Sequence, residues 1–506
     1  MPHASQLLVR RRDFLAGGAA SLAALAALPT QILADPYRSS AILPIGRPTI
    51  RIRGRVMSAG RGVAGAGISD GIRVITADRE GRFQLTSEGG AGFVSVIPPT
   101  GYRLPVSRIG TLSLHRAIQP DRRGEMLVEF TLEPSDGDER HAFLVLADPQ
   151  TQDAHEMARL HAETVPDVQA TVQELGGRCF GVGCGDIMYD ELALFPDYER
   201  AVAAMGIPFA QVVGNHDLDF AGRTDEDSIA TFNRFFGPGR YAFNVGRIHY
   251  VVLDDVFWHG AGYFGYLDAE QLAWLQADLA RVEPGSPVFV FLHIPVFSSN
   301  HQREGEKSPG ISVSVTNREA LYRLLEPYRA RIFSGHMHET EHVFEGGVHE
   351  HTVGAVCGAW WSGDICYDGT PNGYGVFEVN GQDLRWRYKA TGRPAAHQMR
   401  LYPRGADPAA PQDFIANVWG WDPEWSVVWY EGADRRGAMS QRTGRDPLSV
   451  QLHTGDELPA RRPWVDPILT RHLFYAPVPQ NGGSVRVEAT DRWGRIYTEA
   501  LRTEDY

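Results

Sequence analysis

Short apolar runs, each followed directly by a polar group, recur through the middle of the chain. They lie at Phe143-Leu144-Val145-Leu146, Cys179-Phe180-Gly181-Val182, residues 207–213, Val288-Phe289-Val290-Phe291-Leu292 and Arg331-Ile332-Phe333. Apolar runs this short, without strict alternation, are typical of strands that are buried on both faces. We therefore expect buried strands that deliver their polar residues to one edge of a sheet.

The stretches between these runs repeat apolar residues at helical spacing. The pattern covers residues 154–175, 198–205, 267–282 and 317–328. Asp268 stands where it can cap the third helix, and Pro166 is a potential interruption of the first. Strands that alternate with helices in this way predict a layered α/β architecture.

The regions on either side have the alternating pattern of antiparallel strands. Runs at residues 49–56, 71–76, 81–85 and 92–96 are separated by glycine-containing turns and predict a small antiparallel β-sandwich. The polar stretch 134–139 marks a domain boundary. Within the central region, the two-residue turn Gly246-Arg247 predicts a hairpin over residues 241–254.

After residue 368 the helical signal fades and strand-like runs follow, at residues 375–379, 384–388 and 484–489. Trp419, Trp421, Trp425 and Trp429 fall in this region. Such closely spaced tryptophans are typical of the core and rim of a β-domain, although a sugar- or lipid-facing aromatic strip is the alternative.

The N-terminal residues read as a targeting segment. Arg10-Arg11-Arg12-Asp13-Phe14-Leu15 precedes the apolar stretch 16–28, and this order resembles a twin-arginine signal peptide. It predicts export to the periplasm or beyond, with cleavage after Ala34; an uncleaved membrane anchor is the alternative. No later segment is apolar for the ~20 residues that a spanning helix needs, so we expect no transmembrane segment in the mature chain.

At 506 residues the chain is too long for a single core. We predict a signal peptide at residues 1–34, an N-terminal β-sandwich at 35–137, a central domain at 138–369 and a C-terminal β-rich domain at 370–506. The net charge of −13 disfavours a broad grip on nucleic acid. The four cysteines of the chain are too few for a disulfide framework and are expected to be core thiols, with a Cys357–Cys366 bridge as the alternative.

The polar groups at the predicted strand ends combine carboxylate, amide and imidazole side chains. They are Asp148-Pro149-Gln150, Gly185-Asp186, Gly214-Asn215-His216-Asp217, His293 and Gly335-His336-Met337-His338. Hard oxygen ligands together with neutral imidazoles suit a site for divalent cations. Any one of these motifs is weak evidence, whereas all of them in this order point to a metal centre.

In this order the motifs resemble the calcineurin-like metallophosphoesterase family over about residues 139–345, and the flanking β-domains resemble those of an exported three-part subgroup. The resemblance implies a four-layer α/β sandwich, in which helices flank two central mixed sheets. It also implies a hydrolase of phosphate mono- or diesters that uses two divalent metal ions, from among Mn, Fe, Zn, Mg and Ca.

The resemblance further implies a role for each matching residue. Asp186 bridges the two metals; Asp148, Gln150 and His338 complete one ligand set, and Asn215, His293 and His336 complete the other. A bridging hydroxide attacks phosphorus, His216 acts as general acid, and Asp217 orients the ring of His216. Gln150 departs from the family, which usually has histidine there, and a carboxamide favours harder metals.

Two other readings stay open. A catalytically silent cell-envelope protein could keep the fold and the metals, and a purple-phosphatase-like enzyme would need Tyr189 as a further ligand. Trp360, Trp361 and Asp364 could shape a substrate pocket or simply pack. His342, His349 and His351 are expected to be solvated loop residues rather than to line the mouth of the site.

Overall fold

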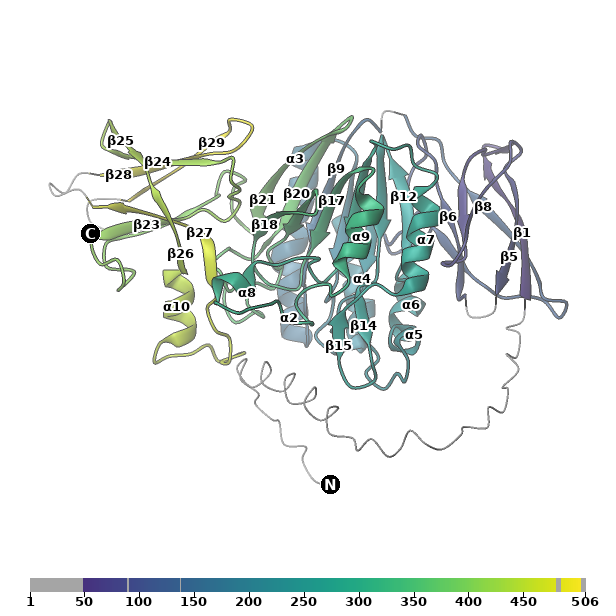
Figure 1. Cartoon of the computed structure of the whole chain (residues 1–506), viewed down its shortest axis with the longest axis horizontal. Coiled ribbons are helices and arrows are strands. Elements are labelled where there is room, and N and C mark those ends of the chain that lie inside the picture. Colours follow the sequence, from purple (N-terminus) through teal and green to yellow (C-terminus); the bar gives the residue numbers. More distant parts are fainter. Residues whose placement is uncertain (1–48, 89–90, 137, 479–483, 502–506) are drawn as a thin grey trace, which may run out of the picture. The chain divides into compact units, whose positions relative to one another are not determined.

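Two β-sheets lie face to face in the middle of the chain (Figure 1). The computed structural model describes residues 49–88, 91–136, 138–478 and 484–501. The predicted signal peptide at residues 1–34 lies outside the described residues. Thr49 onward forms one compact unit by contacts between residues, so the domain limits given above stay a prediction.

The first sheet has five strands in the order β11-β10-β9-β20-β21. Their bounds are β9 Arg140–Leu146, β10 Cys179–Cys184, β11 Phe209–Val212, β20 Gly373–Asn380 and β21 Asp383–Ala390. The first three are parallel, and β20 runs antiparallel to β9. β20 and β21, which contain the predicted strand-like runs 375–379 and 384–388, complete this sheet.

The second sheet has six strands in the order β12-β13-β16-β17-β19-β18. Their bounds are β12 Tyr241–Val245, β13 Ile248–Val252, β16 Pro287–Phe291, β17 Arg329–Ser334, β18 Glu341–Glu345 and β19 Val348–Thr352. β12 and β13 form the predicted hairpin around Gly246, whose φ of 58° favours glycine. β13, β16, β17 and β19 are parallel to one another.

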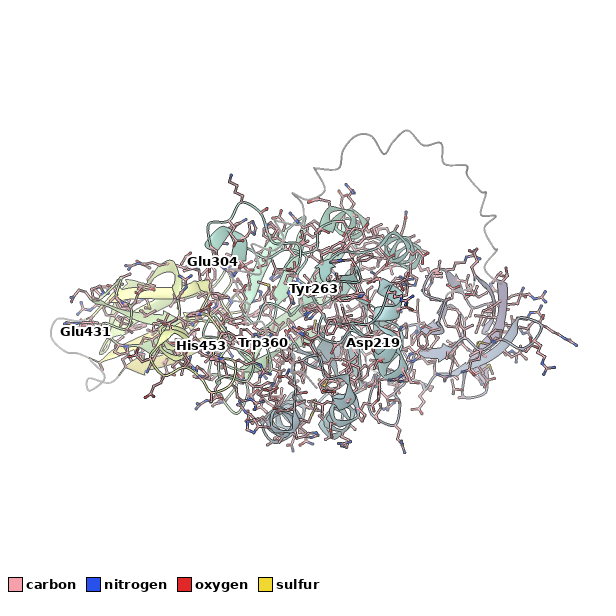
Figure 2. The ribbon with its side chains drawn as sticks, turned by 90° about the horizontal axis from the view of Figure 1, so that it is seen from below. Asp219, Tyr263, Glu304, Trp360, Glu431 and His453 are labelled. Atoms are coloured by element: carbon pink, nitrogen blue, oxygen red, sulfur yellow. The ribbon has the colours of Figure 1, made fainter. Side chains whose placement is uncertain are left out.

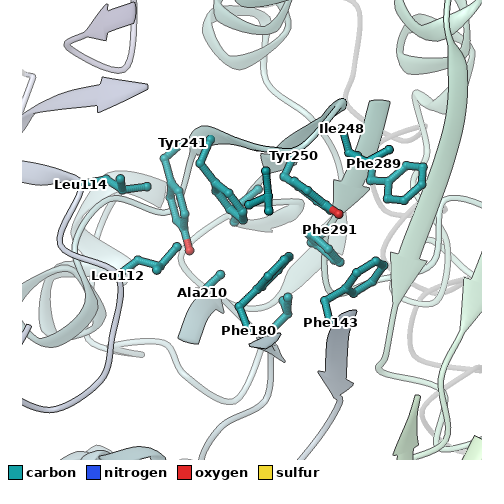
Figure 3. Close-up of a cluster of buried hydrophobic side chains, with 14 of the residues drawn as sticks. Leu112, Leu114, Phe143, Phe180, Ala210, Tyr241, Ile248, Tyr250, Phe289 and Phe291 are labelled. Carbon is teal, nitrogen blue, oxygen red and sulfur yellow. The ribbon is translucent and has the colours of Figure 1, made fainter. Parts of the chain in front are cut away.

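Aromatic side chains fill the space between the two sheets (Figure 3). Phe143 on β9 stacks on Phe377 at 4.9 Å between ring centroids and meets Phe333 of the other sheet at 5.2 Å. Tyr250 contacts Phe180 across the same gap at 5.2 Å. These buried rings remove a large apolar area from water and hold the two sheets in register.

Helices cover the outer face of each sheet, which confirms the predicted four-layer α/β sandwich (Figure 1). On the first sheet they are α2 Ala154–Arg159, α3 Val165–Leu175 and α4 Phe195–Met205; on the second they are α7 Ala269–Leu279 and α9 Arg318–Leu325. Asp268 caps α7 as predicted, because its carboxylate accepts the Gln271 N–H at 2.8 Å. Around Pro166 the helix does not break: a π-helical turn, η3 Leu160–Thr164, joins α2 to α3.

Two further β-layers precede this core. One sheet contains β1 Thr49–Ser58, β2 Arg61–Gly62, β5 Arg82–Glu88 and β8 Glu125–Thr131; the other contains β3 Gly67–Ser69, β4 Val74–Thr76, β6 Phe93–Ile97 and β7 His115–Ala117. The β-sandwich is not purely antiparallel, since β8 returns parallel to β1. It is joined to α7 by the Trp274 Nε1–H, which donates to Ser69 Oγ at 2.8 Å.

The C-terminal region also has two sheets. Their strands are β22 Arg400–Tyr402, β23 Asp413–Asn417, β26 Ser440–Arg445 and β27 Leu469–Pro477 in one, and β24 Ser426–Glu431, β25 Asp434–Ala438, β28 Val485–Thr490 and β29 Ile496–Leu501 in the other. Trp419, Trp425 and Trp429 are buried, which confirms their prediction as core residues. Glu304 (Figure 2) accepts the Leu469 N–H at 3.1 Å and thereby ties this region to the central one.

The remaining elements are short. They are η4 Leu192–Leu194, α5 Asp225–Ser228, α6 Ala230–Phe236, β14 Val256–Trp258, β15 Tyr263–Gly265, α8 Asn300–Arg303 and α10 Pro447–Thr454. All four cysteines carry free thiols, as the core-thiol prediction expects, and Cys179 is only half-buried. Within the described ranges, no helix has the length and apolar character needed to cross a membrane.

Candidate metal centre

The predicted ligands lie at the carboxyl ends of strands from both central sheets. Asp148, Asp186 and Asn215 follow β9, β10 and β11, whereas His293 and His336 follow β16 and β17. The site therefore lies across the ends of two packed sheets, and the expectation of a single sheet edge is wrong. The aromatic core beneath holds the two groups of strand ends together.

Asp186 is the centre of the cluster. One carboxylate oxygen, Oδ1, lies 3.2 Å from Nε2 of His293 and accepts the His216 N–H at 2.8 Å. The other oxygen, Oδ2, is 2.6 Å from the Gln150 amide nitrogen. Ligand atoms of Asp186, His293 and His336 all lie within 4.8 Å of one another. Asp186 thus has the shared position that a bridging carboxylate needs.

Each of the three histidines donates its outer ring N–H to a backbone carbonyl. His293 Nδ1–H donates to Cys184 O at 3.1 Å, His336 Nε2–H to Ser312 O at 2.9 Å, and His338 Nδ1–H to Gly358 O at 2.6 Å. These bonds select the tautomer that leaves the inner nitrogen with a lone pair. Outer-nitrogen bonds of this kind are the usual support of metal-binding histidines.

The inner atoms that converge as a result are all acceptors. His293 Nε2 is 3.2 Å from His336 Nδ1 and 3.2 Å from the Asn215 side-chain oxygen. His338 Nε2 is buried without a hydrogen-bond partner and lies 3.6 Å from Asp148 Oδ1. Lone pairs this close repel one another unless a proton or a metal cation lies among them. The residues present therefore fit bound metal ions.

The electrostatics of the site point the same way. Burial and the neighbouring Asp186 raise the pKa of the Asp148 carboxyl, although the charge of His293 opposes this. Burial lowers the pKa of His336 to about 3 and of His338 to about 4, so both rings are neutral ligands at neutral pH. Burial alone would lower the pKa of His293, but Asp186 outweighs it and raises this pKa to about 10. The raised pKa of His293 shows that the nearby carboxylates create a negative electrostatic potential, which would also attract a metal cation.

Backbone strain is concentrated at the same residues. Asp148, Gln150, Asp186, His336 and His338 all have positive φ, between 38° and 65°. Such conformations cost about 1–3 kcal/mol each and persist where the surrounding structure enforces them, typically at functional sites. A Cβ at Gly214 would lie 1.8 Å from the Asp186 nitrogen, so only glycine permits the two loops to come this close.

Gln150 reaches the site as predicted, but with its amide nitrogen toward Asp186. Its oxygen is 3.6 Å from the Cys357 thiol, and its side chain is buried. A half-turn of the amide exchanges its oxygen and nitrogen at the same positions. The side chain is therefore placed to offer its oxygen to a cation beside Asp186.

The prediction that Asp217 orients His216 is wrong. Asp217 accepts three backbone N–H groups, from Gly214 at 3.0 Å, Ile187 at 3.0 Å and Met188 at 2.9 Å, and thus pins the two metal-site loops together. The ring of His216 is held by Asp190, whose Oδ1 accepts the Nδ1–H at 2.6 Å. The spacing Gly185-Asp186-x-x-x-Asp190 is the sequence signal that could have identified it.

Aromatic side chains lie beside His216. Its ring centroid is 4.6 Å from that of Tyr189 and 5.4 Å from that of Trp360, which Figure 2 labels between the central and C-terminal regions. Trp361 is buried and donates its Nε1–H to Pro149 O at 2.9 Å, so it supports the loop of Asp148. Asp364 is exposed and pairs with Arg159.

A second group of histidines, His342, His349 and His351, is not solvated as expected. His349 and His351 are buried on β19, and their rings pack on Trp386. Nitrogen atoms of the three lie within 4.8 Å of one another. The Arg331 guanidinium donates to His349 Nδ1 at 2.7 Å, so the proton of His349 is on Nε2 and no lone pair remains for a metal.

Comparison with known proteins matches three family models along the chain. The N terminal of Calcineurin-like phosphoesterase matches residues 50–135, Calcineurin-like phosphoesterase matches 143–340, and the C terminal of Calcineurin-like phosphoesterase matches 350–497. Together these matches account for most of the chain.

Individual relatives are more distant. Purple acid phosphatase 22 of Arabidopsis thaliana is 31% identical over 31% of this chain and 37% of its own length, well under two thirds of that protein. The serine/threonine-protein phosphatase CPPED1 of Homo sapiens is 26% identical over 41% of this chain and 67% of its own. A dimetal phosphatase structure from Danio rerio is 14% identical, covering 49% of this chain and 96% of that one at a TM-score of 0.34.

The three family models and the order of the motifs at the strand ends agree with one another. The chain belongs to the calcineurin-like phosphoesterase family.

Proposed function

We propose that this protein hydrolyses phosphate mono- or diesters with two divalent metal ions. The observation that supports this most directly is the convergence of buried acceptor atoms around Asp186, with each histidine held in its ligand tautomer. When bound, the two cations would supply a nucleophile at neutral pH and offset the charge of the phosphoryl group. Phosphatase relatives in the same family support the reaction class.

The two ligand sets are those that the family resemblance implies, and the positions of the side chains support them. Asp148, Gln150 and His338 would hold one cation, Asn215, His293 and His336 would hold the other, and Asp186 would contact both. Asp148 also accepts the His336 N–H at 3.0 Å, which couples the two loops that carry these ligands. The mixture of oxygen and nitrogen donors suits Mn, Fe, Zn, Mg or Ca.

His216 would protonate the leaving oxygen. Its Nδ1–H is occupied by Asp190, so Nε2 is the atom that can give a proton to the substrate. Burial would lower the pKa of this ring, but Asp186 and Asp190 outweigh it and raise that pKa. The imidazole is thereby kept protonated toward neutral pH, as a general acid requires.

The test is hydrolysis of p-nitrophenyl phosphate and bis-p-nitrophenyl phosphate by protein stripped of metal and refilled with each candidate ion. Activity should return with at least one metal, and the preferred substrate assigns the ester class. His216→Ala should lower kcat by about 10²- to 10⁴-fold, whereas His161→Ala, on η3, should not. Full metal binding without hydrolysis of either ester would favour the silent metal-binding alternative.

Export stays a separate proposal, supported by Arg11-Arg12-Asp13-Phe14-Leu15 ahead of an apolar stretch. Replacing both Arg11 and Arg12 by lysine should leave the protein in the cytoplasm of a host with a twin-arginine pathway. Equal export of the wild type and the double variant would contradict this route.

A further inference from the structure

Three aromatic residues from separate segments form a wall beside His216. We call Tyr189, Trp360 and Trp464 the aromatic wall. Tyr189 follows β10, Trp360 follows β19, and Trp464 belongs to the C-terminal region. Tyr189 and Trp360 meet edge to face at 4.8 Å between centroids, and Trp360 and Trp464 meet edge to face at 5.1 Å, so the three rings form one connected cluster.

The wall is held in place more firmly than solvent-facing rings usually are. Trp360 has a φ of 62° and stacks on His338 at 5.0 Å, which ties it to a metal-site histidine. The Arg462 guanidinium lies 5.0 Å above the ring of Tyr189 and donates to the buried Glu156 carboxylate at 3.1 Å. These contacts fix the rings before a ligand arrives, so that little side-chain entropy is lost on binding.

The wall is open to solvent at Trp464. Trp464 keeps 38% of its surface exposed although its ring touches Trp360, and Tyr189 and Trp360 are only partly buried. Arg462 covers Tyr189, and its guanidinium is committed to Glu156. Rigid, partly exposed rings of this kind suit a flat aromatic ring as a ligand.

We propose that the aromatic wall binds the leaving alcohol of the substrate, and that this alcohol carries a flat heteroaromatic ring such as a nucleobase. The inference rests on the proposed function, in which His216 protonates the leaving oxygen. Two of the three rings contact His216 directly. A group bonded to the oxygen that His216 protonates must therefore lie against them. The ring of the substrate would stack on the exposed ring of Trp464, beside Trp360.

The test compares two substrates with the same phosphate and the same primary alcohol, adenosine 5′-monophosphate and ribose 5-phosphate, or their methyl diesters if the enzyme prefers diesters. They differ at the anomeric carbon, which carries adenine in the first and a hydroxyl group in the second. Stacking of this kind is expected to raise kcat/KM for the adenosine ester by about 10- to 100-fold over the ribose ester. Trp464→Ala should reduce that ratio toward one, while Trp421→Ala, a tryptophan of the same region outside the wall, should preserve it.

A second readout does not depend on turnover. Adenosine should quench tryptophan fluorescence of the full-length protein, ribose should not, and Trp464→Ala should reduce the quenching. Equal kcat/KM for both esters with no quenching would overturn the proposal that the leaving alcohol carries a heteroaromatic ring. If both esters are hydrolysed equally fast and much faster than glycerol 3-phosphate, the wall binds the sugar instead. Loss of all hydrolysis with quenching retained would sink the proposed function and leave the binding site standing.

Discussion

The Nδ1 atom of His216 lies 2.6 Å from Oδ1 of Asp190, four residues after the central carboxylate Asp186. The neighbouring Asp217 is turned away from this ring and binds backbone N–H groups instead. One carboxylate thus positions the proposed acid, and the other joins the loops that carry the metal ligands. The two can be separated experimentally.

Replacing Asp190 should impair chemistry more than folding. Asp190→Asn removes the charge that holds the Nδ1–H of His216, so we expect kcat to fall by roughly 10- to 100-fold, with the larger loss for poor leaving groups that need protonation. Phenyl phosphate compared with p-nitrophenyl phosphate measures this difference. An equal loss for both esters would show that Asp190 acts on something other than proton transfer.

Replacing Asp217 should impair folding first. Asp217→Ala leaves three buried backbone N–H groups without an acceptor, and each unsatisfied group costs about 1–3 kcal/mol. Denaturant unfolding should therefore show a loss of at least about 3 kcal/mol in the free energy of unfolding. Asp190→Asn is the matched control, since its carboxylate is exposed, and a stability loss equal to that of Asp217→Ala would refute this division of roles.

Gln150 should set how tightly the protein holds the cation that it shares with Asp148 and His338. Gln150→His replaces an amide oxygen by imidazole, which binds transition metals more strongly. We expect the variant to keep zinc or iron at chelator concentrations at least about 10-fold higher than those that strip the wild type, with metal content measured after dialysis. Unchanged metal retention would indicate that this side chain does not contact the cation.

Acid should destabilise the protein through the cluster of His342, His349 and His351. Burial lowers the pKa of His342 to about 4 and holds that of His351 well below its usual value, aided by nearby charged groups that include Arg331 and Arg492. A histidine whose folded pKa lies below its unfolded value near 6.5 favours folding at high pH. Its stabilisation is complete above about pH 6.5 and is lost as the pH falls toward the folded pKa, at about 1.4 kcal/mol per pH unit per ring.

The melting temperature between pH 7.5 and 5 measures this effect. His351→Phe removes one titrating ring from an aromatic setting, so its melting temperature should fall less steeply with acid than that of the wild type. His161→Ala serves as the control at a more exposed site. Parallel curves for the wild type and His351→Phe would place the acid sensitivity elsewhere.

Tyr189 should not behave as an iron ligand. Its ring is engaged by His216, Trp360 and Arg462, and burial together with Asp190 raises the pKa of its hydroxyl, which opposes the tyrosinate form. Protein refilled with iron should therefore lack a visible iron–tyrosinate band. A band that disappears in Tyr189→Phe would establish the purple-phosphatase-like alternative and remove Tyr189 from the aromatic wall.

Local sequence determined much of the scaffold and pointed to the candidate metal-site residues. Asp268 caps α7 within one turn, and each polar group stands directly behind its own apolar strand. Such features depend on neighbours in the chain, so periodicity and spacing reveal them. The candidate ligands are recognisable because each polar group directly follows the apolar run of its own strand.

Only the tertiary structure decided which side chains serve one another. Asp190 rather than Asp217 holds His216, and Asp217 instead accepts backbone N–H groups from two separate loops. Likewise, β20 joins β9 in the central sheet, and Trp464 reaches Trp360 from the C-terminal region. Hydrogen-bond partners and ring contacts between distant segments depend on how whole layers pack, and that packing is a property of the assembled core rather than of any single stretch of sequence.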